Sequence, residues 1–191
     1  MKPAVAAFLA ALGLLALGAG GCKPADSARA TAAVAAPAPG SVGLSAPAWH
    51  LEDLAGRPVD SPQFKGKVVV LDFWATWCGP CTREIPGLVE LQKKYAGDGL
   101  VVIGVALDEP GRSPLKAPAV VKRYVTKYLV SYLIVLGDDK VQADFGGMDA
   151  IPTTFIIDRD GVIRDKKVGA LPAAQFERRV LKVLKPAAAG I

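Results

Sequence analysis

Cysteine and histidine are scarce in this sequence, whose 191 residues include three cysteines and one histidine. A structural zinc site needs about four ligands, and beyond residue 47 the chain has only Cys78, Cys81 and His50 of these two types. A structural disulfide is disfavoured too, because cysteines so close in sequence close a small loop and constrain the unfolded chain little. The small number of these residues and the close spacing of the cysteines together argue against both common structural uses of cysteine.

The sequence also lacks a block of basic residues, since its net charge of +5 is spread along the chain. A nucleic-acid-binding protein usually concentrates its basic residues in a patch or stripe, so we expect no nucleic-acid partner. Pairs of basic residues such as Lys166–Lys167 lie among acidic and apolar neighbours. We interpret these pairs as solvated faces of helices and strands.

Residues 1–22 have the pattern of an export signal. Lys2 precedes an apolar run over 4–17, and small residues then lead directly to Cys22. The run is shorter than the about 20 apolar residues that a membrane-spanning helix needs. The segment resembles a bacterial lipobox, in which the cysteine is lipidated, although Ala19 stands where that pattern has leucine. We predict lipidation of Cys22 and attachment to a membrane through its acyl chains, with plain cleavage and an uncleaved anchor as alternatives.

Residues 23–47 are predicted to form a flexible tether. The segment holds nine alanines and four prolines and no aromatic residue, so it cannot bury enough apolar surface to fold alone. As a coil it would reach roughly 25–30 Å. The folded domain is therefore placed at 48–186, followed by a short tail at 187–191.

The pattern within 48–186 is that of an α/β domain. Apolar runs and turn residues predict strands over 49–53, 57–59, 68–74, 100–107, 133–136, 153–157 and 162–168. Helices are predicted over 79–96, 117–128, 140–145 and 172–184, with a helical turn at 61–62. Pro86 is expected to kink the first of these helices. A mixed sheet with helices on both faces accommodates this order.

The segment from Trp77 to Cys81 reads WCGPC and lies between a buried strand and the start of a helix. Backbone N–H groups at a helix N-terminus favour negative charge, so Cys78 is predicted to be a stabilised thiolate. The thiolate is the form that attacks disulfides, which makes Cys78 the predicted nucleophile. Cys81 follows one turn later, faces inward and can displace the mixed disulfide.

Asp72 interrupts an otherwise apolar strand. An ionised carboxylate is costly to bury, so desolvation should raise the pKa of Asp72. A salt-bridged or solvent-reaching aspartate is the alternative.

These residues resemble the active site of the thioredoxin superfamily. The segment 72–81 looks like the active-site segment of thioredoxin, and Ile151-Pro152-Thr153 is similar to the cis-proline loop of that family. The hairpin at the start of the domain, the Lys65-Gly66-Lys67 lead-in and the stretch over 108–137 resemble the membrane-tethered TlpA/ResA-type branch. The likeness covers 49–184.

The resemblance implies a thioredoxin-like fold with an N-terminal hairpin and a central insert. It implies a thiol-disulfide oxidoreductase without a cofactor, in which Asp72 helps to move a proton to and from Cys81. Pro152 is expected to be cis and to face the cysteines, with the backbone of Ile151 pairing with a substrate chain as an added strand. The substrate-binding positions implied are Trp77, Gly79, Pro80, Ile151 and Pro152.

The same resemblance implies partners and a location. Gly79 and Pro80 are similar to the pair found in reducing thioredoxins, whose potential is about −270 mV. Disulfides of protein clients are then the substrates, in the periplasm or another extracytoplasmic space. A membrane thiol donor of the CcdA/DsbD type would supply electrons, and cytochrome c maturation is a client pathway by family analogy.

Two other classes remain open at the level of sequence. A thiol-dependent peroxidase would use one peroxidatic cysteine in a Thr/Ser and Arg pocket, and the adjacent resolving Cys81 argues against it. A metal-delivery module would need a histidine near the cysteines, whereas His50 falls in the first predicted strand.

Overall fold

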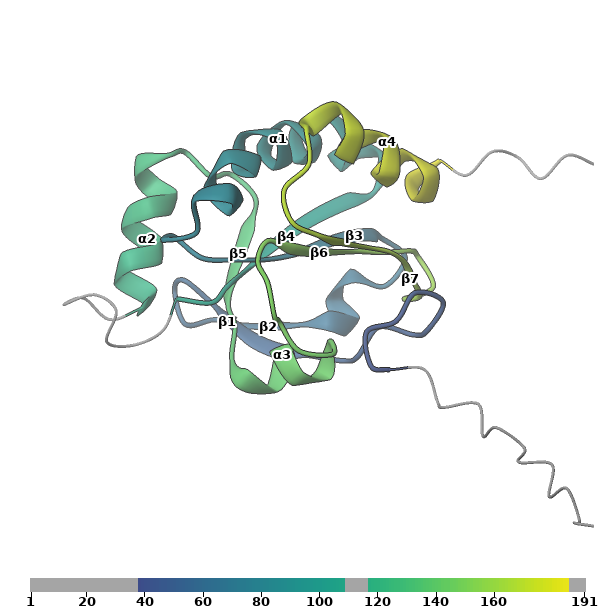
Figure 1. The fold of residues 1–191 in the computed structure, drawn as a ribbon, viewed down its shortest axis with the longest axis horizontal. Coiled ribbons are helices and arrows are strands. Elements are labelled where there is room, and N and C mark those ends of the chain that lie inside the picture. Colours follow the sequence, from purple (N-terminus) through teal and green to yellow (C-terminus); the bar gives the residue numbers. More distant parts are fainter. Residues whose placement is uncertain (1–37, 109–116, 186–191) are drawn as a thin grey trace, which may run out of the picture. The chain divides into compact units, whose positions relative to one another are not determined.

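The computed structural model describes residues 38–108 and 117–185 (Figure 1). The predicted signal at 1–22 with Cys22, most of the tether and the tail lie outside the described residues, as do residues 109–116 of the insert. Within the described ranges, no helix is both long enough and apolar enough to cross a membrane.

The described residues form seven strands in one sheet. The strands are β1 (His50–Asp53), β2 (Pro58–Asp60), β3 (Val68–Trp74), β4 (Leu100–Ala106), β5 (Leu133–Leu136), β6 (Thr153–Ile157) and β7 (Ile163–Val168). The helices are α1 (Gly79–Tyr95), α2 (Ala117–Lys127), α3 (Asp139–Asp144) and α4 (Ala173–Leu184), with short 3-10 helices at Ser61–Phe64 and Ala96–Asp98. All strands and α-helices lie within a residue of their predicted bounds.

The sheet is mixed, in the order β2-β1-β5-β4-β3-β6-β7. Strand β4 pairs in parallel with β3 and β5, whereas β6 pairs antiparallel with β3 and β7, and β1 pairs antiparallel with β2 and β5. The expected mixed sheet and N-terminal hairpin are therefore confirmed. Helix α1 continues through Pro86, and the predicted kink there stays a prediction.

Strand β3 is buried along its whole length because both faces of the sheet are covered. Helices α1 and α4 lie over one face and α3 over the other (Figure 1). Alternate side chains of β3 therefore enter two cores. Val68, Val70 and Trp74 pack in the core beneath α1 and α4, and Asp72 is on their side of the strand.

The described chain begins with a segment that the sequence assigns to the tether, 38–47. The N–H of Gly43 donates to the carbonyl of Ile163 at 2.8 Å, and the N–H of Ile163 donates to the carbonyl of Leu44 at 2.9 Å. The end of the predicted tether is thus paired with the start of β7, and the tether prediction over 23–47 extends too far. Composition did not reveal this pairing because backbone hydrogen bonds need no large apolar side chain.

Gly104 on β4 is predicted to be intolerant of a side chain. A Cβ there would lie 2.6 Å from Cδ1 of Ile134 and 2.9 Å from Nε1 of Trp74. We expect Gly104→Ala to lower the free energy of unfolding by about 1–3 kcal/mol, because overpacking strains a dense core. Urea unfolding measures the change. Gly97→Ala is the control, since no atom lies within 4 Å of a Cβ at that position; equal stabilities for the two variants would contradict the prediction.

Candidate active site at the start of helix α1

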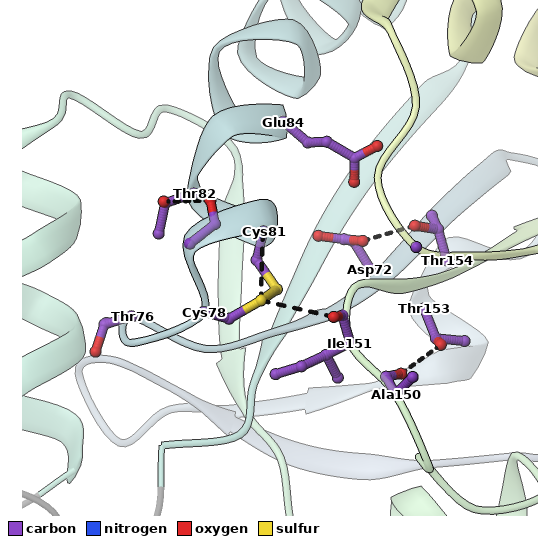
Figure 2. The surroundings of a disulfide bond; sticks show 12 residues. Asp72, Thr76, Cys78, Cys81, Thr82, Glu84, Ala150, Ile151, Thr153 and Thr154 are labelled. Atoms are coloured by element: carbon purple, nitrogen blue, oxygen red, sulfur yellow. Dashed lines mark hydrogen bonds between the residues drawn. A yellow bond between two sulfur atoms is a disulfide. The ribbon is translucent and has the colours of Figure 1, made fainter.

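Cys78 and Cys81 form a disulfide at the N-terminus of α1 (Figure 2). Cys78 is the N-cap residue, with extended φ and ψ of −84° and 99°, and the N–H of Cys81 donates to its Sγ at 3.2 Å. Gly79 and Pro80 make the first turn, where proline is favoured because its missing N–H would be unpaired anyway. The local sequence thus makes the helix begin directly after Cys78, within the redox pair.

The environment of the Cys78 sulfur favours negative charge. The N-terminus of a helix carries partial positive charge, and a backbone N–H points at this Sγ. In the reduced protein the same groups would stabilise a thiolate. Cys78 is 5% exposed and Cys81 is 1% exposed, while the neighbouring Trp77 is 50% exposed.

The loop before β6 lies against the disulfide. The Ile151–Pro152 peptide bond is cis, as the resemblance implies. The carbonyl oxygen of Ile151 is 3.7 Å from Sγ of Cys78 (Figure 2). The hydroxyl of Thr153 donates to the carbonyl of Ala150 at 2.7 Å and ties the loop to the strand. Tertiary structure therefore brings the predicted loop and the predicted cysteines together.

A cleft of about 420 Å³ extends from Trp77 to Ile151 beside the disulfide. Asp108, Asp138 and Asp149 also line it. Trp77 and Ile151 were both predicted as substrate-binding positions, and they share this cleft.

Asp72 lies on the α1 side of β3 and is 1% exposed. The hydroxyl of Thr154 donates to its Oδ1 at 2.7 Å (Figure 2). Burial raises the pKa of Asp72 to about 6; the Thr154 hydrogen bond and the charge of Lys167 oppose this rise, and the charge of Glu84 adds to it. The predicted direction and its cause are confirmed.

Cross-strand pairing aligns Asp72 with two further polar residues. Asp72 is opposite Thr154 on β6, and Thr154 is opposite Lys167 on β7. Directly opposed residues in antiparallel strands point to the same face, so the three side chains form a polar row beneath α1. Lys167 is 3% exposed. The interpretation of the Lys166–Lys167 pair as solvated is wrong for Lys167, because the register of β7 turns this side chain inward.

Glu84, from the second turn of α1, is the counterion of Lys167. The Nζ of Lys167 donates to Oε1 and Oε2 of Glu84 at 2.8 and 2.7 Å and to the carbonyl of Gly169 at 2.9 Å. Oε1 of Glu84 also accepts from the N–H of Leu171 at 2.6 Å. Neither Glu84 nor Lys167 was predicted to be a site residue. The spacing of Glu84 three residues after Cys81 was the available signal, since such residues share a helix face.

Metal ligands do not gather in the described ranges, where no group of three or more His, Cys, Asp or Glu side chains could hold a metal ion. His50 instead pairs with Asp60 across the β1–β2 hairpin.

A two-cysteine redox pair at the start of a helix, facing a cis-proline loop on a mixed sheet, defines a thioredoxin-fold thiol-disulfide oxidoreductase. The chain belongs to the AhpC/TSA family, which matches residues 42–166. It is 36% identical over 138 residues to the thioredoxin-like protein YneN of Bacillus subtilis, covering 72% of this chain and 78% of that protein. It is 33% identical over 144 residues to the thiol-disulfide oxidoreductase ResA of Bacillus anthracis, covering 74% and 78%.

Solved structures agree with this assignment. A thiol:disulfide interchange protein of the thioredoxin family from Chlorobium tepidum superposes with a TM-score of 0.66 at 32% identity, covering 78% of this chain and 99% of that chain. A thiol:disulfide interchange protein from Bacteroides sp. gives 0.65 at 26% identity, covering 78% and 94%. The thiol-disulfide oxidoreductase assignment of the sequence analysis is confirmed.

The raised pKa of Asp72 predicts a stability that depends on pH. Between 3.8 and about 6 the native protein keeps the Asp72 proton while the unfolded chain releases it. The contribution of Asp72 to stability is therefore fully present below that window and is lost as the pH rises through it. The free energy of unfolding of Asp72→Leu relative to that of the wild type should therefore increase by about 2–3 kcal/mol from about pH 4 to about pH 7. This follows from 1.36 kcal/mol for each unit of pKa difference.

Urea unfolding of the wild type and the variant at both pH values measures this gain. The difference between the two proteins cancels the titration of all groups that they share. A stability difference that stays constant across the window would contradict a raised pKa for Asp72.

Proposed function

We propose that this oxidoreductase reduces disulfides of protein clients outside the cytoplasm, with Cys78 as the nucleophile. The observation that carries the proposal is the position of Cys78, whose Sγ accepts from a backbone N–H at the start of α1 and lies 3.7 Å from the carbonyl oxygen of Ile151. The sulfur thus combines a source of thiolate stabilisation with a neighbouring backbone segment able to hold a client.

The first step consumes the client disulfide. In the reduced protein, the Cys78 thiolate attacks one sulfur of the client disulfide, the client S–S bond breaks, and the other client sulfur leaves as a thiolate. A mixed disulfide between Cys78 and the attacked client sulfur remains.

The second step releases the client. The Cys81 thiol gives its proton to the Asp72 carboxylate, and the resulting thiolate attacks Sγ of Cys78. The mixed disulfide breaks, the internal disulfide forms, and the client sulfur that was bonded to Cys78 leaves as a thiolate. Two electrons have passed from the cysteine pair to the client. A carboxyl with a pKa of about 6 suits this transfer, because both of its protonation states are accessible near neutral pH.

The client would bind across the cis-proline loop and the adjoining cleft. The backbone of Ile151 precedes Pro152 and can pair with an extended client segment, as in recognition by strand addition. Trp77, which is 50% exposed, and the first turn at Gly79 and Pro80 supply the opposite side of the contact.

The direction of exchange and the electron source are proposed from the family resemblance. The Gly79-Pro80 pair resembles that of reducing thioredoxins. A reductase in an oxidising compartment must itself be reduced, so we infer a membrane thiol donor of the CcdA/DsbD type that returns two electrons to the disulfide. Cytochrome c maturation is a client pathway in keeping with the TlpA/ResA-type resemblance.

Substitution of each cysteine separates their roles. We expect Cys78→Ser to abolish reduction of insulin disulfides in the presence of a small thiol, because it removes the attacking thiolate. Cys81→Ser should instead accumulate a mixed disulfide with the client, which non-reducing gels and mass spectrometry detect. Trapping through Cys81 in the Cys78→Ser variant, and none in Cys81→Ser, would reverse the assignment. Turnover of peroxide without any disulfide reduction would favour a thiol-dependent peroxidase.

Export and anchoring are tested on the protein from its native membrane. We expect the mature chain to begin at an acylated Cys22, because small residues lead directly into that cysteine. Mass spectrometry of the N-terminal peptide measures the modification, and Cys22→Ala should release the protein from the membrane fraction. An unmodified N-terminus beyond Cys22 would contradict lipidation and leave the redox proposal unaffected.

A further inference from the structure

Three ionisable side chains are buried together beneath the disulfide. Asp72 is 1% exposed, and the side chains of Lys167 and Glu84 are 3% and 9% exposed. They come from β3, β7 and α1, and Figure 2 shows the carboxylate of Glu84 on the same side of the sheet as Asp72. Two carboxyl groups therefore share a largely buried site with one ammonium group.

The hydrogen bonds make the two carboxyl groups unequal. Glu84 accepts two hydrogen bonds from Lys167 and one from the N–H of Leu171. Asp72 accepts one, from the hydroxyl of Thr154. Neutralising Glu84 would weaken three hydrogen bonds from N–H donors, two of them from an ammonium group, whereas neutralising Asp72 weakens one from a hydroxyl. Lys167 directs its remaining contact to the carbonyl of Gly169, so its donors are committed to Glu84 and to backbone.

We propose that Lys167 is a positioning residue that binds Glu84 as a carboxylate and thereby reserves the exchangeable proton of this cluster for Asp72. The inference rests on the proposed function, in which that proton comes from Cys81 during release of the client. Lys167 touches neither the client nor the reacting sulfurs in this scheme. It acts through Glu84 and through its own charge.

The other groups that face Asp72 carry no charge. Thr154 donates a hydroxyl from β6. Burial and the charge of Asp72 raise the pKa of Tyr132, just before β5, well above its ordinary value, so its hydroxyl stays neutral. Cys81 on α1 is in the disulfide. The charges of Lys167 and Glu84 are thus the ones that act on Asp72, and they act in opposite directions.

Removal of Lys167 and removal of Glu84 should shift the protonation midpoint of Asp72 in opposite directions. Lys167→Met leaves the negative charge of Glu84 facing Asp72, so the cluster takes up its proton at higher pH. Glu84→Gln leaves the positive charge of Lys167, so the proton is taken up at lower pH. Each shift should be about one pH unit, as expected for a single buried charge at close range. The double variant, Lys167→Met with Glu84→Gln, should return close to the wild-type midpoint.

The chain offers two matched controls. Lys167→Arg keeps the charge and should leave the midpoint near that of the wild type. Lys166→Met removes the same charge from the adjacent residue. Lys166 is opposite Phe155 rather than Thr154, and its Nζ lies 5.1 Å from the centre of the Phe155 ring. That contact is with the other core, so this variant should leave the midpoint unchanged.

The experiment follows the carboxyl carbon of Asp72 by NMR as the pH is changed. The protein is oxidised, its aspartate residues are labelled with carbon-13, and no client is present. The pH profile of insulin reduction is measured in parallel, and circular dichroism establishes that each variant is folded. Midpoints that move up in Lys167→Met and down in Glu84→Gln support the proposal. Midpoints that stay fixed, or that move in the same direction in both variants, overturn it. Opposite NMR shifts in a protein that reduces no disulfide would overturn the proposed function and leave the proton assignment standing.

Discussion

Strand β3 forms backbone hydrogen bonds to β4 on one side and to β6 on the other, and its register with both strands positions the active site. On one face, the register of β3 with β6 places Asp72 opposite Thr154. The register of β6 with β7 places Thr154 opposite Lys167 and so extends the row. At its C-terminal end β3 leads into the loop that starts α1 at Cys78. A slip by one residue would turn Asp72 into the opposite core, because side chains alternate between the faces of a strand. Redox chemistry and acid–base chemistry therefore depend on one set of strand pairings.

The two cores separated by β3 have different compositions and different roles. On the α3 side, Phe73, Phe145 and Phe155 pack with ring centroids 4.9–5.8 Å apart. Aromatic side chains bury large apolar areas and stabilise a core strongly. On the α1 side, the core includes the polar row beneath the disulfide. The apolar core offsets the desolvation cost of the polar one.

The buried pair of Glu84 and Lys167 is a weak source of stability in itself. Desolvation of two charges consumes much of their attraction, and apolar residues of similar volume often stabilise a fold more. Its position is better explained by its effect on Asp72. Because the pair is neutral as a whole, burial remains the main cause of the raised pKa of Asp72. A carboxyl with a pKa of about 6 is well suited to the proton exchange with Cys81 that we propose.

Local sequence patterns were sufficient to predict the strand and helix positions, the redox pair and the buried acid. These features are local: apolar periodicity defines each element, and Cys78, Cys81 and Asp72 belong to one strand-to-helix segment. Tertiary structure decided which residues surround that acid. Lys167 is buried while its neighbour Val168 is 60% exposed, the reverse of what hydropathy predicts, because pairing with Thr154 fixes which face of β7 turns inward. The same is true of residues 43–46, whose backbone pairs with Gly161 and Ile163 despite a composition typical of a tether. Hydropathy reports the cost of burying each side chain separately, whereas cross-strand register and ion pairing are set by partners far away in the chain.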